Sequence, residues 1–521
     1  MPLINNLTPE ELDEIAYLGR DAFFMRELQN GTALTFNDVT LATNYSQVIP
    51  RQADVSTQLH RLLLPTPIIS ADMDTVTDSR MAIAMAQNGG MGIIHYNMPP
   101  EEQVRQVTQV KHYVHGVIDQ PISVNPTDTI GDVMKMQKDF GTFPVVDKKG
   151  KLVWLIWSSV LQDIHSDRPV SEAMTRRNDI LTITSEELWD DPIETAKRFF
   201  TEHIGKNKLL IVDTDDRLKG LITLSDVQRI TRETWQNKMA QDNEHRLLVG
   251  AALPLWSQSD GSMDTDKLSA HLESLVWSGV DAIAISSAHA HTRNIGEVIQ
   301  LVRSLYEDIT IIAGNVTTAK GVKFLADAGA NVIKVGQWPG SICTTRTVAG
   351  VGIPQLTAVY IASKAAEQSE VQIIADGGIT QSWDIVKAFA AGANAVMLGG
   401  LLGSADEAPG EIFEINGKSY KSYRGMGSTA AMRAGSAARY GHQEGSVGQK
   451  VAPEGISAMK PASWPVSWTL SNLVWGVQSW MWYLWAMSIS EISEKARFIR
   501  ITGAGMDESR THDVTEVSIK N

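Results

Sequence analysis

The chain has 521 residues, of which 43% are hydrophobic and 20% are charged, and this composition is typical of a globular protein with about two or three domains. A formal net charge of −14 argues against a nucleic-acid binder, which needs a basic face, but it allows one small anion in a local pocket. The single cysteine excludes an intramolecular disulfide. With no visible secretory signal and no apolar run of membrane-spanning length, the sequence predicts a cytoplasmic protein that contacts no membrane.

Eight short apolar runs, each followed by glycine or small polar residues, recur along the chain and predict buried strands. From the third onward they alternate with amphipathic stretches, which is typical of a parallel sheet covered by helices. The runs cover residues 66–73, 89–96, 246–253, 280–288, 309–316, 330–336, 371–378 and 393–400. Eight such units predict an α/β fold, a (β/α)8 TIM barrel, and a doubly wound open sheet is the alternative.

Residues 112–233 separate the second run from the third and predict a domain inserted into a catalytic barrel formed by 1–111 and 234–521. Segments 121–156 and 180–226 each have the pattern of a strand, a helix and two strands joined by a turn. This duplication resembles a tandem pair of cystathionine-β-synthase (CBS) modules, a Bateman domain. The resemblance implies a regulatory purine nucleotide held by Thr223 and Asp226. A purely structural insert is the alternative.

Polar residues follow the later strands of the predicted barrel. Asn315, Cys343 and Asp376 come after the fifth, sixth and seventh runs. The carboxyl ends of barrel strands lie on one face, so these side chains are expected to converge there. The hydroxyl-rich loop around Cys343, with Arg346 close by, predicts a partly exposed, electropositive site that favours a reactive thiolate. A solitary packing residue is the alternative.

Three glycine-rich segments, 375–379, 398–400 and 422–428, place bare backbone amides near strand ends. Glycine lets the backbone approach an anion closely. Together with Ser341, these segments predict a nucleotide monophosphate site in which Asp376 accepts hydrogen bonds from ribose hydroxyls. Capping of the following helix is the alternative role for Asp376.

The chain resembles the inosine 5′-monophosphate (IMP) dehydrogenases over nearly its whole length. The matching stretches are LTFNDVTL, MDTVTDSRMAIAMAQNGGMGIIH, AGNVTTA, GSICTTR, GVGIPQLTAV, ADGGI, YRGMGS, ARY, PEG and ITGAG. The resemblance implies oxidation of IMP to xanthosine 5′-monophosphate (XMP) with NAD, the committed step of guanine nucleotide synthesis.

The resemblance also implies a role for each catalytic residue. Cys343 would attack the purine C2 and form a covalent thioimidate, while Thr345 and Glu454 would hold and relay protons. A flap over about 429–462 carries Arg439 and Tyr440, which would enter the vacated cofactor site and activate water.

Three groups of binding residues follow from the same resemblance. The substrate would be bound by Met73, Ser341, Asp376, Gly377, Gly378, Gly399, Gly400, Tyr423, Gly425, Met426, Gly427 and Glu454. NAD would be bound by Ser286, Ser287, Asn315, Gly336, Gln337 and Trp338. A potassium ion would be held by Gly336, Trp338 and Cys343, with Glu508, Ser509 and Arg510 from a neighbouring subunit. This shared ion implies a homotetramer or an octamer.

The sequence departs from the family pattern at three places. Trp338 stands where the family has glycine, which puts strain on the ion site. Ser286 replaces an aspartate that contacts the nicotinamide ribose, so weaker NAD binding is expected. Several tryptophans between 464 and 485 also fall at glycine positions. These tryptophans could pack in the core along a helix, form an interface with a partner or subunit, or result from a sequence error.

Two other functions remain compatible with the motifs. A GMP reductase would share the barrel, Cys343, Thr345 and Glu454, and it would convert GMP to IMP with NADPH. A catalytically impaired, nucleotide-sensing relative is suggested by Trp338 and Ser286. The Arg439 flap argues against the reductase, which has no hydrolytic step to serve.

Overall fold

The computed structural model describes residues 7–47, 49–113, 117–119, 121, 123–135, 142–157, 168–172, 180–188, 192–224, 227–228, 239–256, 258, 262–337, 339–440 and 452–511. The chain divides into two compact units, Met1–Lys111 with Lys238–Asn521 and His112–Asn237. Among the described residues, no helix combines the length and the apolar character needed to cross a lipid bilayer.

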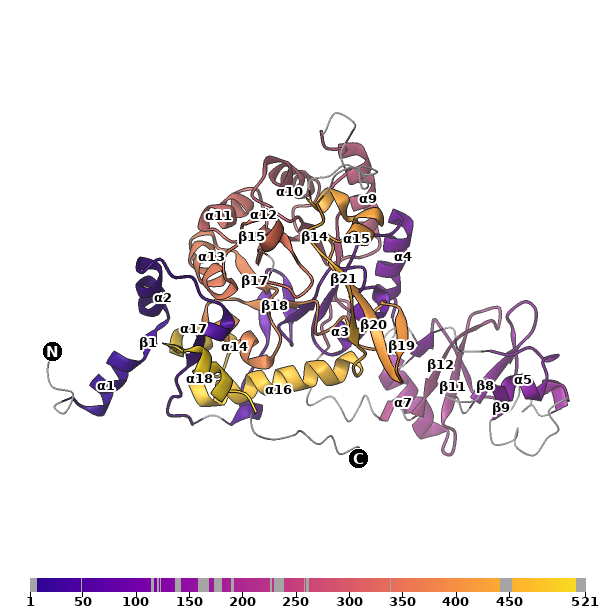
Figure 1. Cartoon of the computed structure of the whole chain (residues 1–521). Coiled ribbons are helices and arrows are strands. Elements are labelled where there is room, and N and C mark those ends of the chain that lie inside the picture. The colour runs from indigo at the N-terminus through magenta and orange to yellow at the C-terminus, as the bar shows by residue number, and fades with distance from the viewer. Residues whose placement is uncertain are drawn as a thin grey trace. The chain divides into compact units, whose positions relative to one another are not determined.

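The larger unit is a closed barrel of eight parallel strands surrounded by helices, as the apolar runs predict (Figure 1). Each strand lies within one predicted run, and the open-sheet alternative is wrong. In chain order the barrel strands and their helices are β5 (Ile68–Ser70), α3 (Ser79–Gln87), β6 (Met91–Ile94), α4 (Pro100–Lys111), β13 (Val249–Ala252), α9 (Thr265–Trp277), β14 (Ala282–Ser286), α10 (Arg293–Leu305), β15 (Thr310–Val316), α11 (Ala319–Asp327), β16 (Val332–Val335), α12 (Thr345–Ala349), α13 (Gln355–Ser369), β17 (Gln372–Asp376), α14 (Ser382–Ala390) and β18 (Ala395–Leu398).

Apolar side chains of moderate size fill the barrel. Ile69, Ile312, Ile374 and Met397 are almost fully buried in one cluster with several alanines of neighbouring strands. The hairpin of β3 (Thr57–Leu59) and β4 (Leu62–Leu64) adds three leucines to this cluster. Burial of a strand on both faces explains why the strands appear as continuous apolar runs in the sequence.

Shorter elements complete the larger unit. At the N-terminus are α1 (Pro9–Ala16), β1 (Leu18–Gly19), α2 (Arg20–Gln29), η2 (Phe36–Asp38), β2 (Val39–Leu41) and η3 (Pro50–Gln52). After the barrel come β19 (Ile412–Ile415), β20 (Lys418–Arg424), α15 (Thr429–Arg433), η6 (Ser436–Tyr440), β21 (Ser457–Pro461), α16 (Val466–Leu484), α17 (Ile489–Lys495), β22 (Arg497–Arg500) and α18 (Gly503–Glu508). Strands β1 and β2 flank β22, which ties the two ends of the chain together.

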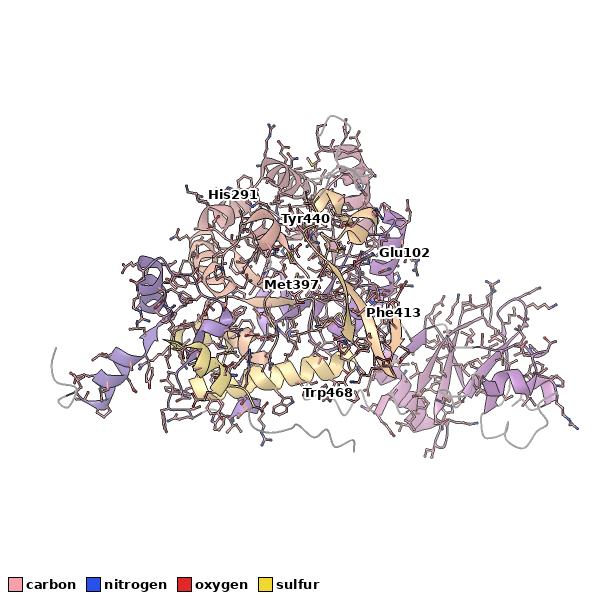
Figure 2. All side chains as sticks on the ribbon, viewed as in Figure 1. Glu102, His291, Met397, Phe413, Tyr440 and Trp468 are labelled. Atoms are coloured by element: carbon pink, nitrogen blue, oxygen red, sulfur yellow. The ribbon has the colours of Figure 1, made fainter. Side chains whose placement is uncertain are left out.

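The tryptophans near α16 do not pack in the core, so the core-packing reading is wrong for most of them. Trp464, Trp468, Trp475 and Trp482 are 38–61% exposed, and Figure 2 shows Trp468 on the outer side of the helix. The buried face of α16 is made instead by Val466, Leu470, Leu473, Val477, Met481 and Leu484. Gly476 lies where α14 comes so close that a Cβ would be 2.3 Å from Ser382 Oγ.

The smaller unit contains two similar halves. The first half has α5 (Ile130–Lys135), β8 (Thr142–Val146), β9 (Leu152–Trp157) and η4 (Val170–Glu172), and the second has β10 (Thr182–Thr184), α7 (Pro192–Glu202), β11 (Lys208–Val212) and β12 (Leu218–Thr223), which pairs with β7 (Val117–Asp119). In each half an aspartate closes the turn between the last two strands, Asp147 in one and Asp213 in the other.

The two turns bond to each other reciprocally. The Leu152 amide donates to the Asp216 carbonyl at 2.9 Å, and the Leu218 amide donates to the Gly150 carbonyl at 3.1 Å. Because these positions correspond in the duplicated sequence, the two halves are related by an approximate two-fold axis through the turns.

Candidate active site

The loop that carries Cys343 is held by a second, distant loop. Cys343 forms an antiparallel bridge with Gly455, and the Thr344 amide donates to the Glu454 carbonyl at 3.0 Å. Cys343 Sγ lies 3.2 Å from Thr345 Oγ1 and 3.5 Å from the Glu454 carbonyl oxygen. The structure therefore brings together Cys343, Thr345 and the backbone of Glu454, three of the five predicted catalytic residues.

The surroundings of Cys343 do not favour a thiolate, so that part of the sequence expectation is wrong. Burial raises the pKa of the thiol, and hydrogen bonds from Thr345 offset this effect only in part. The positive charge of Arg346 lowers the pKa of the thiol, but by less than any of the other causes, and its guanidinium group donates to the carbonyls of Gln337 at 2.9 Å and Ile353 at 2.6 Å. In this arrangement the thiol is protonated at neutral pH.

Arg439 and Tyr440 cover the same end of the barrel. The Arg439 carbonyl accepts hydrogen bonds from the Ala288 amide at 2.9 Å and from Ser287 Oγ at 3.3 Å. The Tyr440 ring lies against Gly427, where a Cβ would be 2.7 Å from the ring. Burial raises the pKa of Tyr440, and the nearby Cys343 raises it further.

A cluster of buried charges lies beneath Arg439. Arg439 Nη1 donates to Asp72 Oδ2 at 2.9 Å, and Lys334 Nζ lies 3.3 Å from Asp72 Oδ1. Lys334 also donates to Ser286 Oγ. Burial alone would raise the pKa of Asp72, but the positive charges of Arg439 and Lys334 lower it from 3.8 to about 2. Burial lowers the pKa of Lys334 despite the neighbouring carboxylate.

A second carboxylate, Asp376, ends strand β17. Asn315 Nδ2 donates to Asp376 Oδ2 at 2.7 Å and to the Gly336 carbonyl at 3.0 Å, and burial raises the pKa of Asp376. Gly336 has a φ of +151°, and a Cβ there would lie 2.1 Å from the Asp376 carbonyl oxygen, so the position accepts only glycine. Asn315 is fully buried, and its side chain fixes Asp376 and the start of the Cys343 loop.

The glycine segments lie close to one another. Pro339 is 3.1 Å from the positions that Cβ atoms would take at Gly377 and at Gly378. A Cβ at Gly399 would be 3.1 Å from Tyr423 Oη and 3.2 Å from Met73 Sδ. Among the described residues, the amides of Gly399 and Gly400 donate no hydrogen bond. The predicted cradle of Gly399, Gly400 and Tyr423 therefore offers donors to an anion.

The segment 425–427 runs between the two loops that hold Cys343. The Gly425 amide donates to the Ile456 carbonyl at 3.0 Å, and the Gly427 carbonyl accepts from the Glu454 amide at 3.0 Å. Met426 is buried, and its carbonyl accepts from Ser436 Oγ at 2.5 Å. This arrangement places the backbone of Gly425, Met426 and Gly427, three of the predicted substrate-binding residues, beside the cysteine loop.

The remaining predicted site residues lie in the buried charge cluster, around the cysteine loop or outside the described residues. Ser286 is fully buried below Arg439, Gln337 accepts from Thr317 Oγ1 at 3.0 Å, and Ser341 is exposed. Trp338 and Asp226 lie outside the described residues, and Thr223 is buried at the end of β12. Glu508, Ser509 and Arg510 are at the end of α18, which Figure 1 shows apart from α12, the helix that follows the cysteine loop.

Sequence reasoning missed three charged residues of the site. Asp72 follows strand β5, Lys334 interrupts the apolar run 330–336, and Lys460 lies on β21 with its Nζ 2.7 Å from the Gly400 carbonyl oxygen. A lysine within an otherwise apolar strand is a visible signal, because a buried charge requires a partner. Nothing in the sequence identifies Asp72 as that partner, since the two residues are 262 positions apart.

Comparison with known proteins gives consistent matches. The model of the IMP dehydrogenase / GMP reductase domain matches residues 33–512. The inosine-5′-monophosphate dehydrogenase of Aquifex aeolicus is 44% identical over 489 residues, which cover 92% of this chain and 95% of the relative. That of Escherichia coli strain K12 is 41% identical and covers 93% and 96%. A GMP reductase variant of Trypanosoma brucei with bound guanosine 5′-monophosphate has a TM-score of 0.72 at 33% identity, covering 93% of this chain and 98% of that one.

The buried cluster predicts a large effect on stability for Asp72→Asn. Loss of the carboxylate leaves Arg439 and Lys334 buried without their acid, so the free energy of unfolding should fall by about 3 kcal/mol. Because the folded-state pKa of Asp72 is lowered from 3.8 to about 2, its contribution is complete above pH ~4 and is lost as the pH falls toward 2.

Denaturant unfolding at pH 7 measures this loss. Asp308→Asn is the control, because the same change removes an ion pair with Arg61 in which the two side chains are 73% and 59% exposed. The control should change the free energy of unfolding by less than about 1 kcal/mol. Equal small effects of the two substitutions would contradict the stabilising role of the cluster.

Proposed function

Because the chain belongs to the IMP dehydrogenase / GMP reductase family, we propose that it oxidises IMP to XMP, with NAD as hydride acceptor and water as the source of the new oxygen. One observation carries the proposal. Cys343 Sγ lies 3.2 Å from the Thr345 hydroxyl, at the barrel end that Arg439 and Tyr440 cover. The nucleophile Cys343 and Arg439, which could activate water for hydrolysis, therefore lie at the same end of the barrel.

In the first half of the reaction, the Cys343 sulfur adds to C2 of the purine and loses its proton. The Thr345 hydroxyl is the side-chain group placed to take part in that transfer. The hydride at C2 then leaves with its electron pair to NAD, and the purine remains bound to sulfur as a thioimidate. Covalent catalysis divides one difficult oxidation into easier steps.

In the second half, water adds to C2 and the carbon–sulfur bond breaks, which releases XMP and the free thiol. Overall, IMP, NAD and water give XMP, NADH and one proton. The Asp72 carboxylate outweighs burial and raises the pKa of Arg439, so this residue is cationic in the present arrangement. Arg439 therefore orients the water, and it gains basicity only when the pair with Asp72 loosens, with Tyr440 beside it.

Polar groups suited to NAD would become accessible if segment 436–440 moved away from the end of β14. The Ser287 hydroxyl and the Ala288 amide follow β14 directly. In this structure both donate hydrogen bonds to the Arg439 carbonyl. Gln337, held by Thr317 and by His289 at 3.2 Å, lies on the neighbouring edge. Ser287 and Gln337 would hold the nicotinamide end, and the bound cofactor would supply the hydride acceptor.

Regulation, ion binding and assembly belong to the same proposal. The smaller unit would bind a purine nucleotide, and Thr223 would be one of its ligands. A potassium ion would use the carbonyls of Gly336 and Cys343, although the Gly336 carbonyl already accepts from Asn315. A tetramer would bring residues 508–510 of a second copy to that ion.

GMP reduction is the second candidate, because solved structures of a Trypanosoma brucei GMP reductase resemble the chain at 31–33% identity. That reaction releases ammonia from GMP and needs no activated water. The position of Arg439 beside Ser287 favours the hydrolytic reaction. NADH formation from IMP and NAD, compared with IMP formation from GMP and NADPH, separates the two.

Cys343→Ala should abolish NADH formation from IMP and NAD, with a loss of at least about 10³-fold, because no other described group replaces the sulfur. IMP should still bind to the glycine cradle, and isothermal titration calorimetry with IMP alone checks this. Substantial turnover by the variant would rule out the covalent mechanism.

Arg439→Ala should separate hydride transfer from hydrolysis. Rapid mixing with IMP and NAD should give a burst of about one NADH per site, followed by steady turnover reduced by about 10²-fold or more. Intact mass spectrometry should detect the purine bound to protein. Arg433→Ala, an exposed arginine of α15, is the matched control and should turn over normally. Loss of the burst in Arg439→Ala would place this residue in the redox step or in folding.

Replacement of residues 112–237 by a short linker should leave IMP oxidation intact, because no described residue of the candidate site belongs to the smaller unit. The same deletion should remove any response of the rate to added purine nucleotides. Steady-state assays with ATP, GTP and GMP check both expectations. An assembled but inactive deletion would show that the smaller unit is needed for catalysis.

A further inference from the structure

Lys460 lies beside the glycine turn that follows the last barrel strand. It belongs to β21, which pairs with β20, and its Nζ donates to the Gly400 carbonyl at 2.7 Å. A Cβ on Gly400 would be 3.4 Å from the same Nζ, and the Tyr423 ring centroid is 5.7 Å away. The ammonium group thus lies at the surface of the turn whose amides form the predicted anion cradle.

Among the described residues, no acid balances the charge of Lys460. No carboxylate of the described residues forms an ion pair with it, and burial lowers its pKa without an opposing charge. One of its three N–H donors is used by Gly400, so two remain. Lys421, on the adjacent strand, differs in this respect, because its ammonium group donates to the carbonyls of Ala405, Asp406 and Ala408. The ammonium group of Lys421 is therefore fully hydrogen-bonded within the fold, whereas that of Lys460 has two N–H groups that could bind a ligand.

The other groups at this turn are neutral donors. The amides of Gly399 and Gly400 donate to no described residue, and Tyr423 Oη lies 3.1 Å from the Cβ position of Gly399. Burial raises the pKa of Tyr423, so its phenol keeps its proton. A nucleoside 5′-monophosphate carries about −1.5 to −2 charges on its phosphate at neutral pH. A cradle of neutral donors leaves that charge without a counter-ion.

We propose that Lys460 is the cationic ligand of the substrate phosphate and makes the site selective for nucleotides over nucleosides. The inference rests on the proposed function only in taking IMP as the ligand. Charge-assisted hydrogen bonds to phosphate are stronger than bonds between neutral groups. Lys460 therefore adds to the binding of the phosphate and not to the chemistry at Cys343.

Lys460→Gln tests the proposal, because glutamine keeps a donor for the Gly400 carbonyl and removes the charge. Isothermal titration calorimetry of the full chain without NAD, with IMP, inosine and inorganic phosphate, gives the three affinities. We expect IMP and inorganic phosphate to bind about tenfold more weakly or worse, and inosine to bind as in the unaltered chain. Lys418→Gln, at the exposed start of β20, removes an equal charge and should change none of the three. Lys460→Arg should restore IMP binding in part.

Two results would overturn the proposal: an equal loss of IMP and inosine affinity, which would mean that Lys460 only shapes the turn, or no loss for IMP. Thermal unfolding of each variant shows whether it is folded, and Lys460→Met repeats the test if the glutamine variant is not. A selective loss of IMP affinity supports the lysine assignment even if IMP and NAD yield no NADH. If IMP and NAD yield NADH but Lys460→Gln leaves the IMP affinity unchanged, the lysine assignment is refuted and the proposed function stands.

Discussion

The ion pair between Asp72 and Arg439 joins parts of the chain that are 367 residues apart, and the arrangement of the site depends on it. Both side chains are buried, and Lys334 shares the carboxylate from strand β16. Charges removed from water are tolerated only when they are paired and hydrogen-bonded. The pair therefore holds segment 436–440 on the barrel, and any ligand that displaces Arg439 must offset the loss of this pairing.

The barrel could be predicted from the sequence because its signal is local. A strand buried on both faces needs a short continuous apolar run, and each of the eight runs contains one barrel strand. The helix and the two paired strands of each half of the smaller unit were likewise visible in its duplication. The predicted leading strand is present in the second half as β10, whereas in the first half only an isolated bridge between Val124 and Val145 stands in its place. Of the three readings of the tryptophan segment, core packing is wrong for most of the tryptophans, because α16 buries a stripe of valine, leucine and methionine side chains instead.

The site was only partly predictable, since its decisive contacts are not local. Glycines and hydroxyls at strand ends indicated the anion cradle, but the pairing of Cys343 with Gly455 spans more than a hundred residues. The state of the thiol was predicted wrongly for a related reason. Arg346 is close in sequence, but its guanidinium group donates to two backbone carbonyls, and burial then dominates the pKa of Cys343.

The site has two ends that differ in charge: a buried cluster of nearly balanced charges, and the glycine turn, where Lys460 is positive. Beneath Arg439, the cations Arg439 and Lys334 and the carboxylates Asp72 and Asp376 form a buried and nearly neutral group. Because its positive and negative charges nearly cancel, such a group can position water and the purine but would not attract the substrate phosphate strongly. At the glycine end, Lys460 has no acidic partner among the described residues, so its charge remains available. Binding energy from a phosphate would thus arise away from the reacting carbon, where it can position the purine against Cys343 without neutralising the charges that hold Arg439.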